Sequence, residues 1–416
     1  MIKRLLIGAT LFALIALGVK ADAANPAKIV GLVGACDTTA SGCIPIPLNP
    51  SLLCDGTGAI LDCPQYASPN FADTTGSQFY GLTNRVNPPR CVKSINGGTG
   101  WGLCDAGTAS PFTGALDNLG ANFAVASDGS LIAAGDQGTD NCIIRRSTNG
   151  GVSWTTVFTD STTVNVSCGL GFGAPTPNTL RCASANPYCV MISFISGSFD
   201  LLAYWSTNNG ASWSTGTPFN IVSADAQIGV AVASNGSSGS LTRYAGNYNT
   251  AGRVFAKTSG ADWTTDGLIP TPPGEADGNA FRCVSGAMIF SGQSVLCGPG
   301  SALTTTYHFY THGAGSTANA ANVIPQNGLT NAQAPNFMAV GYSGTAAYIV
   351  GRNAATTQVV IWVTQDTFST MFQVGTLTPT TALIGGCCSG DIFSYRGKIY
   401  FTSGASGSNA FFGVVQ

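Results

Sequence analysis

Short apolar runs alternate with polar, glycine-rich segments along most of the chain. Four such runs fall between residues 121 and 158, and they read ANFAVAS, SLIAAGD, CIIRRST and SWTTVF. Four more follow between residues 179 and 218, namely TLRCASA, CVMISFIS, LLAYWST and SWSTGTP. Runs of this length that are bounded by Gly, Ser, Asn and Thr are typical of β-strands. The pattern therefore predicts units of four short strands.

An eight-residue phrase, Ser-x-Asn-x-Gly-x-x-Trp, connects the third and fourth runs of these units. It starts at residues 94, 147 and 206, so that successive copies lie 53 and 59 residues apart. Ser and Asn side chains close local turns, Gly tolerates positive φ, and Trp offers a large face for packing. The phrase predicts a corner between two strands. Its fixed positions are Ser94, Asn96, Gly98, Trp101, Ser147, Asn149, Gly151, Trp154, Ser206, Asn208, Gly210 and Trp213.

Weaker copies of the phrase start at residues 38, 256, 311 and 364 and continue the same period. Internal repeats that each supply four strands predict an all-β fold, a β-propeller, in a single domain over residues 24–416. We expect seven blades, with six as the alternative because residues 45–90 are the least regular part. Three strand-like runs follow the last phrase, so the first strand of the mature chain, KIVGLVGAC, should complete their blade and join the two termini.

The N-terminal segment has the pattern of an export signal. Lys3 and Arg4 precede the apolar run LLIGATLFALIALGV, and Ala21-Asp22-Ala23 offers a cleavage site between small residues. The apolar run is shorter than the roughly 20 residues of a membrane span. The segment 1–23 is therefore predicted to be a signal peptide, with an uncleaved anchor as the alternative. A secreted or periplasmic location follows from this interpretation.

Composition narrows the classes of partner. Charged residues make up 9% of the chain and the net charge is −2, so no basic surface is expected to attract nucleic acid or anionic lipid. Fourteen cysteines behind an export signal predict a disulfide framework. His308 and His312 are the only histidines and no C-x-x-C pair occurs, so we expect neither a metal nor another cofactor.

Local spacing predicts most of the disulfide pairs as staples across hairpins and loops. The expected pairs are Cys36–Cys43, Cys54–Cys63, Cys91–Cys104, Cys142–Cys168, Cys182–Cys189 and Cys283–Cys297. Cys387 and Cys388 are adjacent, and neighbours in a regular strand point to opposite faces. A bond between them would need a distorted backbone, which Gly386 and Gly390 permit. The alternative is that both are small buried thiols.

The phrase resembles the Asp-box, or BNR repeat, of the sialidase-like propeller superfamily. Asp usually stands in that family where this chain has Asn96, Asn149 and Asn208, and Asn makes the same turn. The resemblance implies that the boxes lie at the corners between third and fourth strands, away from the family's catalytic face. It therefore implies that the box residues are scaffold.

The resemblance also implies what catalysis would require: an arginine triad, a Tyr nucleophile assisted by Glu, and an Asp acid/base. No Phe/Tyr-Arg-Ile-Pro phrase occurs, and Glu275 is the only glutamate. Glycoside hydrolysis needs two flanking acidic groups, or a Tyr with a carboxylate. Glu275, with Asp136 or Asp140 in the segment GDQGTDN, is therefore the candidate catalytic set. Arg352, in VGRNAATT on the same expected face, is a candidate ligand-binding residue.

These features favour a secreted, non-catalytic propeller that binds a glycan or protein ligand through the loop face opposite the boxes. The alternative is a sialidase-like glycoside hydrolase or lyase that acts on extracellular glycans. Neither function calls for nucleic acid, nor for a membrane once the signal is removed, and the sequence predicts no particular oligomeric state.

Overall fold

A computed structural model defines the fold, and its chain divides into two units, residues 1–48 and 49–416. The described residues all lie in the second unit. They are 50–55, 63–83, 88–105, 110–116, 121–137, 141–161, 166–168, 178–195, 200–217, 219–220, 229–234, 241–247, 253–257, 264–268, 288–290, 293–298, 307–313, 319–324, 339–343, 346–352, 358–364, 372–378, 390–396, 398–404 and 410–415. For residues 229–352 the description covers the backbone alone.

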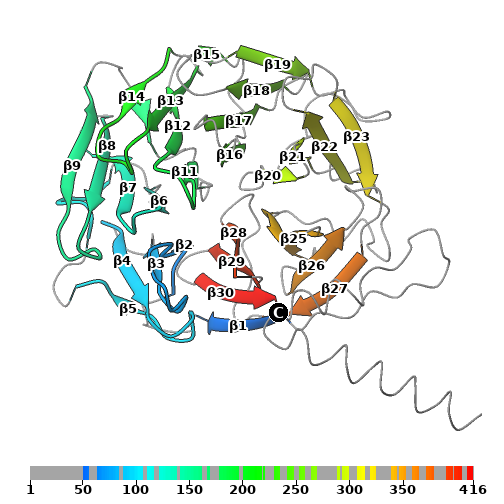
Figure 1. Cartoon of the computed structure of the whole chain (residues 1–416), viewed down its shortest axis with the longest axis horizontal. Helices are drawn as coiled ribbons and strands as arrows, with labels where there is room; N and C mark the ends of the chain where they lie inside the picture. Colours follow the sequence, from blue (N-terminus) through cyan, green and yellow to red (C-terminus); the bar gives the residue numbers. More distant parts are fainter. Residues whose placement is uncertain are drawn as a thin grey trace, which may run out of the picture. The chain divides into compact units, whose positions relative to one another are not determined.

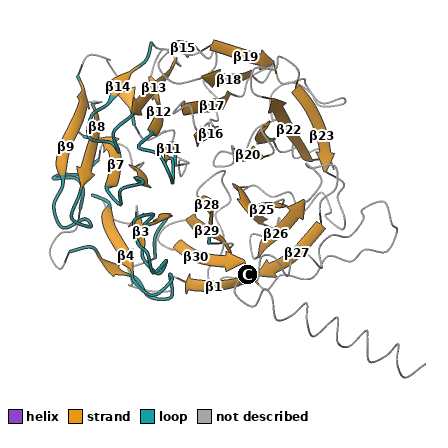
Figure 2. Ribbon diagram, viewed as in Figure 1, coloured by secondary structure: helices purple, strands orange, loops and turns teal. Residues whose placement is uncertain are grey.

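The described chain consists of strands and loops, without a helix in these ranges (Figure 2). Accordingly, the same ranges contain no helix with the length and hydropathy of a membrane span. The expected signal peptide, residues 1–23, lies outside them.

The strands form antiparallel sheets, most of four strands in sequence order (Figure 1). The first sheet contains β2 (Tyr66–Pro69), β3 (Phe79–Thr83), β4 (Arg90–Ser94) and β5 (Gly102–Leu103). The second contains β6 (Ala121–Val125), β7 (Leu131–Asp136), β8 (Cys142–Ser147) and β9 (Thr155–Asp160). The third sheet is centred on β12 (Cys189–Ile195) and β13 (Asp200–Ser206). On one side, β10 (Val166–Ser167) and β11 (Leu180–Cys182) pair with β12. On the other side, β14 (Ser214–Thr215) and β15 (Phe219–Asn220) pair with β13.

Three further sheets follow in the same order. They are β16 (Gly229–Ser234), β17 (Leu241–Asn247), β18 (Arg253–Lys257) and β19 (Thr264–Leu268); β20 (Met288–Phe290), β21 (Gln293–Gly298), β22 (Tyr307–Gly313) and β23 (Asn319–Ile324); and β24 (Ala339–Ser343), β25 (Ala346–Arg352), β26 (Val359–Thr364) and β27 (Phe372–Leu377). The first strands of successive sheets contact one another, from β2 through β6, β11, β16, β20 and β24 to β28 and back to β2.

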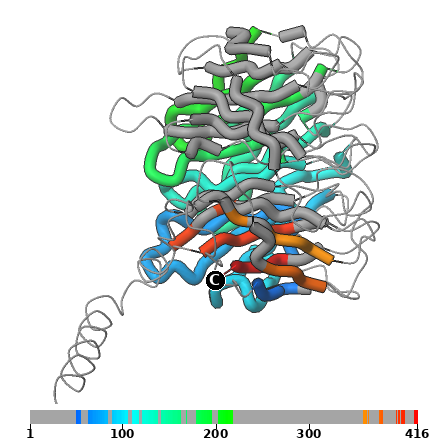
Figure 3. Tube along the Cα trace, turned by 90° about the vertical axis from the view of Figure 1, so that its right-hand side faces the viewer, coloured from blue at the N-terminus to red at the C-terminus, as the bar shows by residue number. Residues whose placement is uncertain are grey.

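The last sheet combines both ends of the described chain, and the N-terminal strand in it is Pro50–Asp55, whereas the expected strand KIVGLVGAC lies outside the described residues. Its order is β28 (Gly390–Tyr395), β29 (Lys398–Gly404), β30 (Ala410–Val415) and β1 (Pro50–Asp55). The dark-blue β1 lies beside the red C-terminal strands in Figure 3, and its Pro50 pairs with Val415. Across to the first sheet, the guanidinium of Arg396 donates to the backbone carbonyls of Thr74 and Thr75 at 2.7 and 2.9 Å.

The core lies between the faces of adjacent sheets. Tyr66, Tyr80 and Leu82 of the first sheet form one buried cluster with Phe123 and Ala133 of the second. A further cluster joins the second sheet to the third, and another joins the first sheet to the last. Because the first and second sheets are covered on both faces, β3, β6 and β7 are buried along their whole length. This explains why their sequences are continuous apolar runs without strict alternation.

Candidate functional site

The three clear phrases form the same hydrogen-bonded turn. In each one the Ser hydroxyl accepts a bond from the backbone amide of the phrase's Gly, at 3.0 Å for Gly98 and 2.9 Å for Gly151 and Gly210. The Asn side-chain oxygen accepts from the Ser hydroxyl and from the amide of the seventh residue. The Trp indole donates to the carbonyl of the same Gly. The phrases therefore close the corner between the third and fourth strands.

Each turn packs against the sheet that precedes it. Gly151 has a φ of 88°, and a Cβ there would lie 2.7 Å from the Cβ of Cys104 and the Sγ of Cys91 in the first sheet. At Gly210 the same atom would lie 2.4 Å from Ile132 of the second sheet. Glycine is thus required both for the left-handed backbone and for the close approach.

The indoles of the phrases are only partly buried. Trp154 packs on the cluster between the first and second sheets, Trp213 on the next cluster, and Trp101 against Phe412. Each ring lies where the fourth strand begins, at the outer edge of its sheet, so solvent reaches one side of it.

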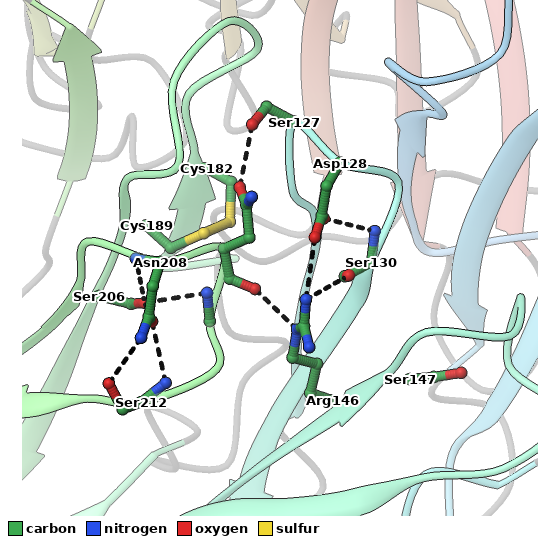
Figure 4. Close-up of polar contacts among 12 residues, drawn as sticks. Ser127, Asp128, Ser130, Arg146, Ser147, Cys182, Cys189, Ser206, Asn208 and Ser212 are labelled. Atoms are coloured by element: carbon green, nitrogen blue, oxygen red, sulfur yellow. Dashed lines mark hydrogen bonds and ion pairs between the residues drawn. A yellow bond between two sulfur atoms is a disulfide. The ribbon is translucent and has the colours of Figure 1, made fainter.

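A polar network links the turn of the third phrase to the second sheet (Figure 4). Arg146, from β8, donates from Nε to the carbonyl of Asn209 at 2.9 Å and from a terminal nitrogen to Asp128 at 2.9 Å and Ser130 at 2.7 Å. Ser127 donates to the side-chain oxygen of Asn209 at 2.9 Å. Asn209 itself has a φ of 56°. At this end of the second sheet, the side chains of Arg146 and Ser127 therefore connect the second sheet to the third.

The opposite end of the second sheet carries the candidate Asp136. Asp136 ends β7 and Asp160 ends β9, and both pair in register with Cys142, which starts β8. Both carboxylates are buried. The backbone amide of Cys168 donates to Asp136, and the Cys142–Cys168 disulfide, with a Cα–Cα distance of 5.1 Å, holds Cys168 in place. Asp136 therefore faces inward, although its surrounding sequence indicates a solvated loop.

Asp160 makes a second buried contact between the second and third sheets. The hydroxyl of Tyr204, in β13, donates to its carboxylate at 2.7 Å. Burial, and then this hydrogen bond, raise the pKa of Tyr204 above its usual value of 10.0. A raised pKa opposes formation of the phenolate, so Tyr204 is not prepared to act as a nucleophile. Tyr204 belongs to the buried cluster between the second and third sheets.

Among the described residues beside Asp136, neutral polar groups face outward. The side chain of Gln137 donates to the hydroxyl of Thr113 at 3.3 Å, and both groups are at least partly exposed. The backbone amide of Gln137 donates to the carbonyl of Asn141 at 3.2 Å. Thr113 follows Phe112, which is buried against Gly135 of β7. The corner at Thr113 and Gln137 thus presents an amide and a hydroxyl on a packed base.

The other candidate residues are covered only in part. Glu275 and Asp140 lie outside the described residues. Arg352 ends β25, the second strand of its sheet, as Asp136 ends β7, so both occupy the strand end remote from the turn between third and fourth strands. The side chain of Arg352 is outside the description, and convergence of these residues on one pocket stays a prediction.

Four of the expected disulfides are present among the described residues. They are Cys54–Cys63, Cys91–Cys104, Cys142–Cys168 and Cys182–Cys189. Of the other cysteines, Cys297 lies in β21, and Cys36, Cys43, Cys283, Cys387 and Cys388 lie outside the described residues. No group of metal-binding side chains occurs within the described part.

Sequence reasoning missed the buried amides that join the second and third sheets. The side chain of Asn122 donates to the carbonyl of Cys168 and accepts from the amide of Thr179. Asn178 accepts from the amide of Phe123 at 3.1 Å and donates to its carbonyl at 2.7 Å. The sequence does contain a signal for the buried position of Asn122, because it is the one polar residue inside the apolar run ANFAV.

Comparison with known proteins supports the fold and goes no further. No protein-family model and no curated protein matches the chain. The BP39L lectin from Burkholderia pseudomallei has a TM-score of 0.51 at 12% identity, over 84% of this chain and 94% of its own. An oligogalacturonate lyase from Vibrio parahaemolyticus has a TM-score of 0.50 at 10% identity, over 89% and 97%. Repeated four-stranded antiparallel sheets and a lectin propeller as neighbour define the class of this protein as a β-propeller.

Proposed function

We propose that this protein is a secreted or periplasmic propeller that binds a glycan or protein ligand without catalysis, through the face opposite the phrase turns. The proposal includes seven blades, a ring closed by pairing of β1 with β30, and phrases that act as Asp-boxes. The closed succession of contacts between first strands supports the blade number. The shared turn geometry supports the Asp-box interpretation, and four disulfides support an oxidising compartment.

The orientation of Asp136 is the main observation that supports a non-catalytic function. Its carboxylate is buried and accepts from the amide of Cys168, while Gln137 and Thr113 point outward beside it. Amides and hydroxyls that lie on a rigid base can exchange hydrogen bonds with a neutral polar ligand. A lectin among the neighbours of this fold is consistent with a sugar in that role.

The test combines a binding screen with a turnover assay. The mature protein is applied to a glycan array, and hits are measured by calorimetry for wild type, Thr113→Val and Gln137→Ala. Loss of about tenfold in affinity, which corresponds to about 1.4 kcal/mol, is expected for a lost hydrogen bond to ligand. Thr99→Val, in a phrase turn, is the control and should bind like wild type.

Turnover is measured on aryl glycosides and on acidic oligosaccharides for wild type and Glu275→Gln. The proposal expects no product from either protein. Product release that depends on Glu275 would show a glycosidase or lyase and would overturn it.

A further inference from the structure

Two consecutive arginines in β8 have opposite surroundings. Ala134 pairs with Ile144 and belongs to the cluster between the second and third sheets. Ala133 pairs with Arg145 and belongs to the cluster between the first and second sheets. Because residues directly opposite in a sheet share a face, Arg145 lies on the side of the first sheet. Arg146 lies on the other side, where it contacts Asn209.

The two guanidinium groups differ in how well their donors are satisfied. Arg146 donates to a carbonyl, a carboxylate and a hydroxyl. The Nε of Arg145 is buried and, among the described residues, has no hydrogen-bond acceptor. Burial lowers the pKa of Arg145. A buried donor nitrogen without an acceptor is costly, so an ion or water is expected to supply the missing contact.

The position of Arg145 between its neighbours shows how such a group would reach it. On one side it pairs with Ala133, which is fully buried. On the other it pairs with Thr156 of the outermost strand β9, which is exposed. The arginine therefore lies where the core between the two sheets opens to solvent, close to the phrase that begins at Ser147. The exposed side, next to β9, is the route by which a small ligand would reach the guanidinium.

We propose that Arg145 binds a small oxyanion, a carboxylate or a sulfate group, on the face of β8 that lies toward the first sheet. The planar guanidinium matches both groups because it presents parallel N–H donors to two oxygens. The anion can be a free ion or an acidic group of a saccharide, and both present the same pair of oxygens. This site is separate from the face opposite the phrases and does not depend on the function proposed for that face.

The test follows thermal unfolding of the mature protein at constant ionic strength, with chloride replaced stepwise by sulfate, acetate or galacturonate in the low millimolar range. Wild type should show a saturable rise in melting temperature, since a ligand that binds only the folded state stabilises it by mass action. Arg145→Met should lose the rise, and Arg145→Lys should show a weaker one. Arg90→Met, a half-buried arginine of β4, is the matched control and should respond like wild type.

The comparison without added oxyanion excludes a purely structural role. There, Arg145→Met should melt no lower than wild type, because it removes a half-buried charge whose Nε, among the described residues, lacks an acceptor. Saturable stabilisation by sulfate alone identifies a free-ion site, and stabilisation by galacturonate beyond acetate identifies an acidic sugar. Identical responses of wild type and Arg145→Met to every anion, or no response from wild type, overturn the proposal in favour of a water molecule.

Discussion

The Nε of Arg146 donates to the backbone carbonyl of Asn209, 63 residues further along the chain, at 2.9 Å. The bond joins a strand of the second sheet to a turn of the third. Asn209 is the only non-glycine at the left-handed positions of the three phrase turns that the structure describes. The contact therefore stabilises a strained residue from outside its own sheet.

Arg146→Met should lower the free energy of unfolding by about 1–2 kcal/mol. Hydrogen bonds to charged groups contribute about 1.5–3 kcal/mol each, but the ion pair with Asp128 is partly solvated and adds little. Urea denaturation with unchanged slope provides the measurement. Thr148→Val, exposed in the neighbouring phrase, should be neutral; a loss there equal to that of Arg146→Met would show that the link is not the cause.

Gly151→Ala should cost clearly more than Gly97→Ala, although both residues have positive φ. A Cβ at Gly97 meets nothing within 4 Å, whereas at Gly151 it overlaps the Cys91–Cys104 disulfide. The left-handed backbone alone costs about 1–2 kcal/mol, and overpacking adds about 1–3 kcal/mol. Calorimetric melting of the two variants measures the difference, and equal losses would contradict the packing of this turn on the first sheet.

Trp154→Ala should destabilise the protein by about 2–3 kcal/mol, below the range of about 3–5 kcal/mol for a fully buried aromatic. The ring packs on the core but remains partly exposed. Val152→Ala, in the same phrase and 55% exposed, should change almost nothing. Chemical denaturation monitored by circular dichroism serves for both, since Trp154→Ala removes one of the six tryptophans and so changes the fluorescence signal. Unchanged stability of Trp154→Ala would remove the scaffold role of this phrase.

Tyr204→Phe should cost about 1–3 kcal/mol, because it leaves the buried carboxylate of Asp160 without this donor. It should also change the response to alkali. The folded-state pKa of Tyr204 is raised, so its contribution to stability is fully present below the unfolded-state pKa, near 10, and declines as pH rises above it. Wild type should therefore lose stability above about pH 10 more steeply than Tyr204→Phe. If the stability of both proteins changed with pH in the same way from pH 8 to pH 11, Tyr204 would ionise equally easily in the folded and unfolded states.

The repeated turns could be predicted from sequence because every contact within them is local. Ser, Asn, Gly and Trp of each phrase bond to one another within a few residues. Disulfides between cysteines that are close in sequence could be predicted for the same reason. The partners of Asp136 and Tyr204 were not, since they come from 32 and 44 residues away. The sequence pattern shows that Asp136 ends a strand. Only the packing of the third sheet against the second shows that its carboxylate points inward.

The dependence of each turn on the sheet before it has a consequence for how such a chain can change in evolution. Gly151 fits the disulfide of the first sheet, and Gly210 fits Ile132 of the second. A duplicated or exchanged segment that starts and stops at sheet boundaries would bring a turn shaped for the wrong neighbour. The heritable module is therefore a surface of one sheet together with the turn of the next, and recombination within a sheet, between these two halves, would disturb the fold least.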